Sequence, residues 1–309
     1  MANYTTLDQI DVPVLAGRYG IEQPKLTGLA GGAANSSFRV SSPSGEFVLT
    51  VLDNHDPRSA QRLAVHTQAL FRLGIPTTEV VAARDGSLTV PLGASTAILK
   101  RWVAGDVIDP LPLALLPDAG RALARLHLLD PASSGLEEVP VGARRLSPAH
   151  LERIVQFEDR DFADWLTTGL DRVRAAEGEA RRQYRIVHGD LFADNIVVSE
   201  DSRLTILDWE TVSLDDPLLD LGMAAVGLAQ ENNMLVPARV RALVGGYRSV
   251  VPLTDQDAAT LPVEIRHAAL IIAFHRYFRH NIRFPDPDKR TTHRALMHFV
   301  DSIDGPALL

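Results

Sequence analysis

Along the first hundred residues, short apolar runs alternate with turns that contain glycine or proline, a pattern that favours β-strands. One amphipathic stretch interrupts them at 56–73. It has Pro57 in its first turn and Gly74 after its last apolar residue, which predicts a helix. A further short helix is expected over 3–20. The predicted strands cover residues 25–30, 38–41, 47–52 and 95–103.

Beyond residue 104 the apolar positions recur mostly at helical spacing. Residues 130–147 are rich in proline, glycine and serine and are expected to form a loop. Another helix is expected to begin at Asp215, with acidic residues in its first turn as the helix dipole favours. The remaining predicted helices cover 115–129, 148–158, 160–168, 170–182, 237–249, 255–283 and 290–303.

Two short β-branched runs, Ile196–Val198 and Leu204–Leu207, flank a polar turn and predict a β-hairpin. Asp190 and Asn195 precede the first strand, and Asp208 follows the second. Because a hairpin brings its two ends together, these three polar side chains are expected to converge.

Convergence of two carboxylates and an amide suits phosphoryl transfer. Asp190 would orient the attacking hydroxyl, while Asn195 and Asp208 would hold Mg²⁺ on the phosphates of ATP. Oxygen ligands are those that this hard cation prefers. A buried hairpin with solvated carboxylates at its ends is the alternative, but the order and spacing of all three groups favour the kinase interpretation.

The catalytic stretch resembles the H-R-D-x-x-x-x-N and D-F-G pair of protein kinases, with Gly189 in place of the arginine. In the form His-Gly-Asp with Asp-Trp it resembles the aminoglycoside phosphotransferase and choline kinase superfamily. The resemblance implies an α+β, protein-kinase-like bilobal fold. A small N-terminal lobe (1–103) would carry an antiparallel sheet and one helix, a linker would lie near 101–106, and a larger helical lobe would follow (104–309).

The same resemblance places the nucleotide. A glycine-rich turn between two strands covers the phosphates in such folds, because glycine lets backbone N–H groups approach and nearby polar groups add donors. The strand that ends near Trp102 would lead to the adenine-pairing linker, although ordinary strand packing is an equal alternative for that residue. The predicted ATP-binding residues are Gly31, Gly32, Asn35, Ser36, Ser37, Lys100, Trp102 and Val103. The resemblance further implies that Asp220 fixes the catalytic loop and that His127 is a structural hydrogen-bonding residue.

One departure from the kinase pattern concerns the third strand, where most kinases carry a lysine that pairs with a glutamate on the next helix. Here that position is Thr50, and the helix at 57–73 has no acidic residue. Lys100, on the strand before the linker, is a candidate to supply the missing charge. Exposure at the surface is the alternative role for Lys100.

The composition of the chain limits the classes of partner and chemistry that it can have. The net charge of -8 disfavours nucleic acid, and the absence of cysteine excludes disulfides and thiolate chemistry. The N-terminal stretch lacks the pattern of a signal peptide, and no apolar run has the length of a membrane span. The expectation is a cytoplasmic enzyme, either monomer or homodimer, that acts on a small molecule.

Several stretches resemble homoserine kinases of the aminoglycoside-phosphotransferase-like type, which also carry threonine at the position of Thr50. These stretches are N-S-S-F at 35–38, F-V-L-T-V-L at 47–52, R-L-G-I-P at 72–76 and H-G-D-L-F-A-D-N at 188–195. Homoserine is a zwitterion, so its site needs a cation for the carboxylate. Arg276, Arg279 and Arg283 share one face by helical spacing and are the candidates, with a solvated basic face as the alternative.

Two other functions stay open. A polycationic antibiotic or choline would call for an acidic pocket, which Asp161, Asp164 and the acidic residues at 152–161 could line. A nucleotide-binding pseudokinase is suggested by Thr50 and by the missing helix glutamate. The presence of all three groups of the catalytic stretch argues against the pseudokinase.

Overall fold

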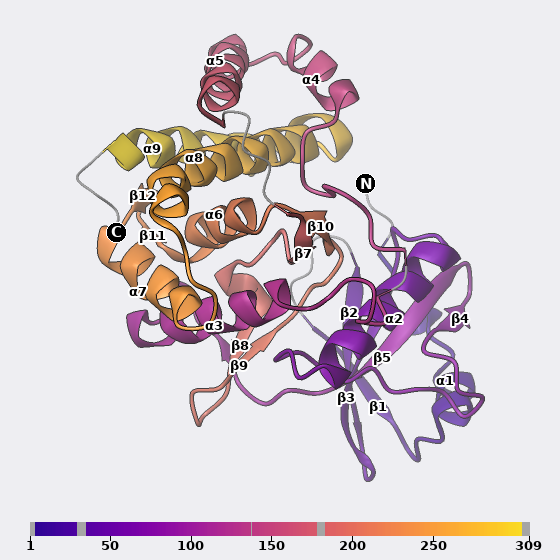
Figure 1. Ribbon diagram of the computed structural model, residues 1–309. Coiled ribbons are helices and arrows are strands. Elements are labelled where there is room, and N and C mark those ends of the chain that lie inside the picture. Colours follow the sequence, from indigo (N-terminus) through magenta and orange to yellow (C-terminus); the bar gives the residue numbers. More distant parts are fainter. Residues whose placement is uncertain (1–3, 30–34, 137, 178–182, 305–309) are drawn as a thin grey trace. The chain divides into compact units, whose positions relative to one another are not determined.

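The structure is a computed structural model that describes residues 4–29, 35–136, 138–177 and 183–304. The chain forms two compact units (Figure 1). The first comprises 1–106, 132–138 and 199–210, and the second comprises 107–131, 139–198 and 211–309. The predicted division at 103 and 104 stays a prediction. No helix in the described part of the chain is long and apolar enough to cross a membrane.

An antiparallel sheet forms the centre of the first unit, with strand order β1-β2-β3-β5-β4. Its strands are β1 (Lys25–Gly28), β2 (Ser36–Ser42), β3 (Gly45–Val51), β4 (Val90–Leu92) and β5 (Ser95–Arg101). Phe38, Leu49 and Leu99 pack on one face of the sheet with residues of the N-terminal segment. Ile98 packs on the other face against Ala60 and Ala64, which are small residues one turn apart on a helix.

That helix is α2 (Pro57–Arg72), and its prediction is confirmed. The Asp56 side chain accepts a hydrogen bond from the Ser59 N–H at 2.9 Å and so caps the first turn. The helix expected over 3–20 is instead a 3₁₀ turn (Leu7–Gln9) followed by α1 (Val12–Tyr19). A new helix starts there because Asp11 caps it through the Val14 N–H at 3.0 Å.

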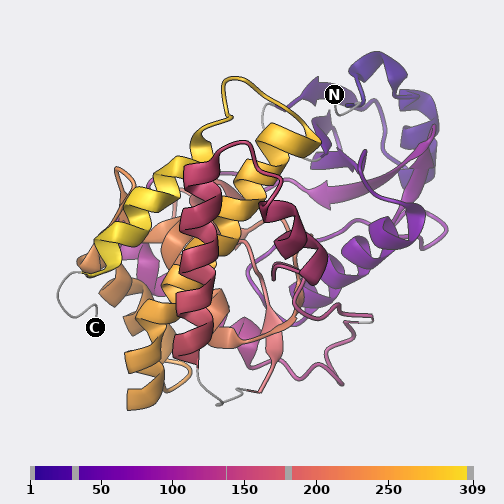
Figure 2. The same ribbon diagram turned by 90° about the horizontal axis from the view of Figure 1, so that it is seen from above.

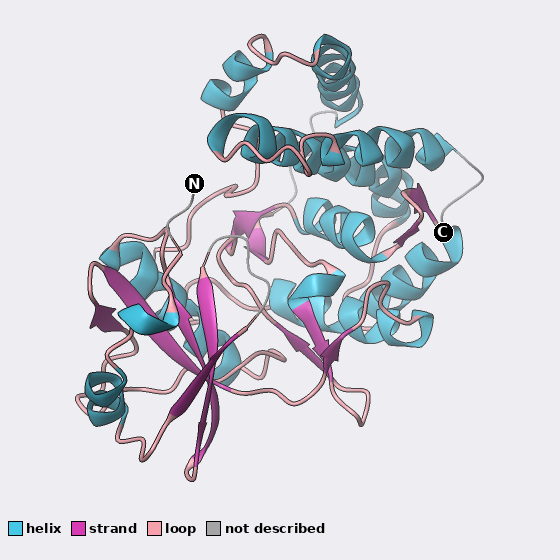
Figure 3. Ribbon diagram, turned by 180° about the vertical axis from the view of Figure 1, so that it is seen from behind, coloured by secondary structure: helices cyan, strands magenta, loops and turns pink. Residues whose placement is uncertain are grey.

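Helices predominate in the second unit (Figure 3). They are α3 (Leu116–His127), α4 (Pro148–Ile154), α5 (Arg160–Glu177), α6 (Pro217–Leu228), α7 (Pro237–Arg248), α8 (Asp255–Tyr277) and α9 (Ala295–Asp301). The long helix α8 packs against α5, α6 and α9, and Figure 2 shows α5 running beside α8. The α+β class is confirmed.

Some predicted helix boundaries are wrong. The sequence predicted a break between 168 and 170, but α5 continues through Gly169. A Cβ at that position would lie 2.7 Å from Leu270 Cδ2 of α8, so this glycine serves close helix packing. The helix expected over 255–283 is also interrupted. Its α-helical part, α8, ends at Tyr277, and the chain continues as a π-helix (Phe278–Arg283).

The remaining strands are short. In the second unit β7 (Arg185–Val187) pairs antiparallel with β10 (Ser213–Asp215), and β11 (Gln230–Glu231) with β12 (Met234–Leu235). The hairpin strands predicted from the sequence are present as β8 (Ile196–Val198) and β9 (Leu204–Ile206), and β6 (Asp106–Val107) lies beside β8 in the same sheet. The turn between β8 and β9 is closed by a bond from Ser199 N–H to the Arg203 carbonyl at 3.0 Å.

Candidate active site

The predicted catalytic residue, Asp190, lies in the loop that follows β7. The backbone N–H groups of His188 and Gly189 donate to the two carboxylate oxygens of Asp220, at 2.8 and 2.7 Å. Asp220 lies in the first turn of α6, which packs on α8. As expected, Asp220 fixes the backbone of the loop that carries Asp190 to a largely buried helix.

A second layer holds Asp220 itself. His127 Nε2 lies 3.0 Å from its carboxylate, and the other ring nitrogen lies 2.8 Å from the Tyr247 hydroxyl. Burial by itself raises the pKa of Asp220, but the hydrogen bond from His127 and the charges of His127 and His188 outweigh burial and lower it. His127 therefore has the structural role expected from the sequence.

Gly189 satisfies two constraints at once. Its φ is +79°, a left-handed conformation that costs little for glycine. A Cβ here would lie 2.9 Å from Arg144 Cγ and 3.2 Å from the Thr211 carbonyl oxygen. Any larger residue would push the loop away from Arg144.

Two arginines interact with the Asp190 side chain. Arg144 Nη2 donates to Asp190 Oδ1 at 2.9 Å, and both side chains are partly buried. Arg276, near the end of α8, interacts electrostatically with both Asp190 and Asp194. Burial, followed by the charge of Asp190, raises the pKa of Asp194, while Arg276 acts in the opposite direction. The Asp190 carboxylate thus lies among groups of both signs.

Asn195 lies in the same unit as Asp190. Its side-chain Nδ2 donates to the backbone carbonyl of Asp190 at 2.9 Å. The amide nitrogen is thereby fixed on the catalytic loop, which leaves the amide oxygen to serve as a ligand. An oxygen donor from an amide fits a magnesium ion that also takes phosphate and water ligands.

Asp208, the second predicted ligand, belongs to the first unit and has a φ of +57°, an uncommon conformation for a residue other than glycine. Its neighbour Trp209 anchors the segment, because it is buried and its Nε1 donates to Thr77 Oγ1 at 2.7 Å. The backbone N–H of Glu210 donates to Asp208 Oδ1 at 3.3 Å. Since Asp190 and Asn195 lie in the other unit, the convergence of all three stays a prediction.

A polar cluster surrounds Glu210 within the first unit. Its carboxylate accepts a hydrogen bond from Asn35 Nδ2 and lies 3.5 Å from His55 Nε2. Burial acts to raise the pKa of Glu210, but His55, Asn35 and the charge of Lys100 together lower it. Burial lowers the pKa of Lys100, and the charges of Asp208 and Glu210 oppose that shift. Glu210 is therefore an acidic neighbour of Lys100, whereas α2 has no acidic residue.

The sheet register relates Lys100 to Thr50. Thr50 lies opposite Ile98 and Lys100 lies opposite Val48, so Thr50 and Lys100 are diagonal neighbours on one face of the sheet. The Thr50 hydroxyl is buried and has no hydrogen-bond partner among the described residues. These positions fit the hypothesis that Lys100 replaces the third-strand lysine.

Trp102 follows the end of β5, and its backbone N–H donates to the Glu46 carbonyl at 3.1 Å. The Arg39 guanidinium lies 4.5 Å from the centre of its ring. Arg39 pairs with Val48, so its side chain projects from the same face as Lys100. The strand predicted to reach Val103 ends at Arg101, and both linker candidates lie just beyond it.

The predicted phosphate-covering turn is partly described. Gly31 and Gly32 lie outside the described residues. Ser36 donates through both its backbone N–H and its hydroxyl to Asp53 Oδ2, at 2.9 and 2.7 Å, which gives Ser36 a structural contact. Ser37 lies opposite Thr50 and shares the face of Lys100. Asn35 is held by Glu210, and its own Oδ1 is buried without a partner among the described residues.

The three predicted substrate arginines differ in their surroundings. Arg276 lies on the α-helical part and interacts electrostatically with Asp190 and Asp194. Arg279 and Arg283 lie on the π-helix, 5.8 and 5.1 Å from the centre of the Phe284 ring. Arg276 is thus the predicted arginine for which a charge interaction with Asp190 is seen.

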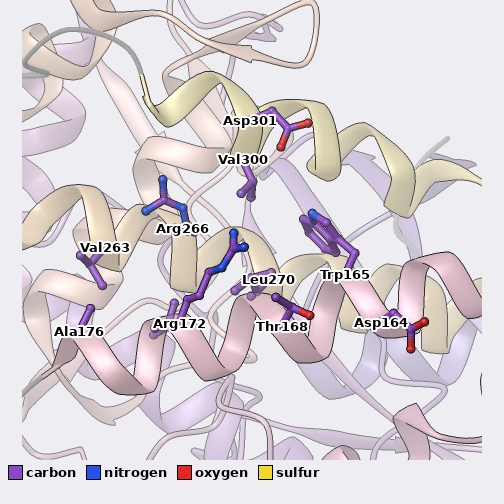
Figure 4. A pocket seen from close by; sticks show the side chains of 12 residues that line it. Asp164, Trp165, Thr168, Arg172, Ala176, Val263, Arg266, Leu270, Val300 and Asp301 are labelled. Atoms are coloured by element: carbon purple, nitrogen blue, oxygen red, sulfur yellow. The ribbon is translucent and has the colours of Figure 1, made fainter.

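Of the predicted acidic residues, Asp164 lies in a cavity of mixed charge. Asp164 lines a cavity of about 520 Å³ between α5, α8 and α9 (Figure 4). Trp165 and the side chains of Arg172, Arg266 and Asp301 line the same cavity, so its charge is mixed. Such a lining offers little to a polycation.

Three residues of the site were missed in the sequence. Arg144 lies in the predicted loop 130–147, where no periodicity marks a position. His55 precedes α2 as an ordinary turn residue. Glu210 was visible directly after Asp208-Trp209, but nothing in its spacing connects it to Asn35, which is 175 residues away.

Comparison with known proteins gives matches to a family model, to related sequences and to solved structures. Residues 25–253 match the model of the phosphotransferase enzyme family (APH). A homoserine kinase of Methylobacillus flagellatus is 27% identical over 249 residues, 79% of this chain and 76% of that protein.

Among solved structures, spectinomycin phosphotransferase APH(9)-Ia in complex with ADP and spectinomycin superposes with a TM-score of 0.70. It is 15% identical and covers 96% of this chain and 94% of its own. Amicoumacin kinase in complex with AMP-PNP, Ca²⁺ and amicoumacin gives 0.69 at 14% identity, over 95% and 94% of the chains. The predicted kinase-like fold is confirmed.

Proposed function

This chain belongs to the phosphotransferase enzyme family, and we propose that it transfers the γ-phosphoryl group of ATP to the hydroxyl of a small amino acid. L-Homoserine is the leading acceptor. The observation that carries this choice is the pair of arginines at the catalytic carboxylate, Arg144 at 2.9 Å and Arg276 linked to it by charge. Guanidinium groups in that position suit an acceptor that brings its own carboxylate.

Asp190 would bind the acceptor hydroxyl and take its proton. A carboxylate is a weak base for an alcohol, but the transition state of phosphoryl transfer is loose, so the proton moves late and orientation matters most. The hydrogen bonds from the loop backbone to Asp220 hold Asp190 in position for this task.

The donor set fits Mg²⁺, because Asn195 and Asp208 offer an amide and a carboxylate oxygen. When bound, the ion would neutralise charge on the phosphates. Lys100, kept near Asp208 and Glu210 by charge, would add a cation on the nucleotide side. The homoserine kinases among the relatives support the choice of acceptor, at 27% identity.

Release of ADP with Mg-ATP across a panel of acceptors tests the proposal. The panel comprises L-homoserine, L-threonine, choline, methylthioribose and several aminoglycosides, with Asp190→Ala as the blank. We expect homoserine to exceed the blank by ~10²–10⁴-fold, the range for a positioned acid or base. A fall of less than about tenfold in Asp190→Ala contradicts the role of Asp190. Turnover confined to choline or an aminoglycoside contradicts the proposed acceptor.

A further inference from the structure

The ion pair between Arg144 and Asp190 occupies the carboxylate that has to receive the acceptor. Arg144 Nη2 lies 2.9 Å from Asp190 Oδ1, and the side chains are 20% and 27% exposed. Partial burial strengthens such a pair, because solvent and salt screen it less than on an open surface. In this state one oxygen of Asp190 is already used.

Contacts of the loop around Arg144 keep this arginine beside Asp190. Its backbone carbonyl lies 3.0 Å from His275 Nε2 on α8, and its Cγ lies against the space left open by Gly189. Its Nε is buried and has no hydrogen-bond partner among the described residues. The Nε–H of the guanidinium is therefore a donor that a further oxygen could accept from.

The guanidinium on Asp190 Oδ1 takes up one of the two oxygens that could bind the acceptor hydroxyl. Release of this pair opens both carboxylate oxygens to the hydroxyl. A planar guanidinium releases one carboxylate most readily when a second takes its place, because two parallel N–H···O bonds can form.

We propose that Arg144 transfers from Asp190 to the carboxylate of the acceptor, so that the correct acceptor frees its own catalytic base. The inference rests on the proposed function, since it assumes phosphoryl transfer by Asp190. Arg276 is the second cation that keeps the acceptor carboxylate in place. Water carries no carboxylate, so the pair also restrains ATP hydrolysis when no acceptor is bound.

Two analogues of homoserine separate the parts of this inference. L-2-Aminobutyrate has the carboxylate but no hydroxyl, whereas 3-amino-1-propanol has the hydroxyl but no carboxylate. With the wild-type protein and Mg-ATP, L-2-aminobutyrate should raise ATP hydrolysis at least about threefold above the acceptor-free rate, and n-propylamine should not. No stimulation by L-2-aminobutyrate overturns the proposal, and this measurement needs no variant.

The variant Arg144→Met tests the same residue directly. One charge-assisted hydrogen bond corresponds to about 10- to 100-fold in kcat/KM. We expect the preference for homoserine over 3-amino-1-propanol to fall by that factor, and acceptor-free ATP hydrolysis to rise. Arg144→Lys should restore part of the preference, because it keeps the charge but not the planar fork. An unchanged preference and an unchanged hydrolysis rate in Arg144→Met overturn the inference.

Arg145→Met is the matched control. This neighbouring arginine donates to Asp215 at 2.7 Å, so its loss disturbs the same loop through a different carboxylate. The melting temperature should fall, while the preference between the two acceptors stays as in the wild type. If wild-type protein fails to phosphorylate homoserine, the proposed acceptor is wrong. Comparison of acceptor-free hydrolysis between wild type and Arg144→Met then still decides whether Arg144 restrains Asp190.

Discussion

Replacing Asp220 by asparagine would change the charge beneath the catalytic loop while keeping the size of the side chain. The carboxylate accepts from the backbone N–H groups of His188 and Gly189 at 2.8 and 2.7 Å, and His127 Nε2 lies 3.0 Å away. Its side chain is 1% exposed, so water cannot replace a lost acceptor. Asparagine has one acceptor oxygen and must turn its amide N–H₂ toward one of these donors.

The cost follows from these contacts. A buried donor without an acceptor costs about 1–3 kcal/mol, and each remaining bond loses about 1 kcal/mol when its acceptor is no longer charged. We therefore expect Asp220→Asn to lower the free energy of unfolding by about 3–5 kcal/mol. Because the displaced backbone carries Asp190, kcat should also fall, by roughly 10²-fold or more.

Urea unfolding and kcat measured on the same preparations test this expectation. Asp216→Asn is the matched control: Asp216 caps α6 through the Leu218 N–H at 2.8 Å, and asparagine caps a helix equally well. The control should change stability by less than about 1 kcal/mol. An Asp220→Asn protein with wild-type stability and wild-type kcat would refute the role assigned to this residue.

The pH dependence of stability gives a second test of the role of Asp220. The pKa of Asp220 is lowered in the folded chain, so the folded state binds fewer protons than the unfolded state over the interval between the two pKa values. Its contribution is therefore present above the unfolded pKa of about 4 and is lost as pH falls through the folded value. Asp220→Asn should remove this part of the acid sensitivity.

Three further predictions concern other parts of the site. Lys100→Met and Glu210→Gln should each raise the KM for ATP, by about tenfold, with a smaller effect on the KM of the acceptor; equal effects on both substrates would argue against a nucleotide-side role. Gly189→Ala should lower kcat while the protein still folds, because the added Cβ displaces Arg144 and disfavours the φ of +79° at this position. A folded variant with wild-type kcat would contradict this. Burial and the charge of Arg144 lower the pKa of His275 to about 4, so the folded state gains stability as pH rises from about 4 to 6.5. The contribution should reach at most about 3 kcal/mol and should be absent from the unfolding curves of His275→Asn.

Local sequence patterns were enough to predict much of the fold. Asp56 and Pro57 mark the start of α2, and β-branched runs mark the hairpin at β8 and β9. These signals act within a few residues, so one segment carries them completely. The ends were less certain, because packing decides them: α5 runs through Gly169, since that glycine faces Leu270.

Contacts between distant segments had no such signal. Arg144 and Asp190 are 46 residues apart, and the loop that holds Arg144 follows no periodicity. Helical spacing placed Arg276, Arg279 and Arg283 together, but the change to a π-helix after Tyr277 alters the angle per residue. Such features depend on tertiary packing, which a single sequence read segment by segment does not contain.

The segment 199–210 has a consequence for the order in which the chain becomes structured during synthesis. It belongs to the first unit, and its Trp209 is buried there with its indole bound to Thr77. A nascent chain that has just passed residue 106 therefore lacks part of its own core and must wait for roughly a hundred more residues to emerge. At translation rates of about 5–20 residues per second, that delay is about 5–20 s, during which the incomplete first unit is exposed to chaperones and proteases.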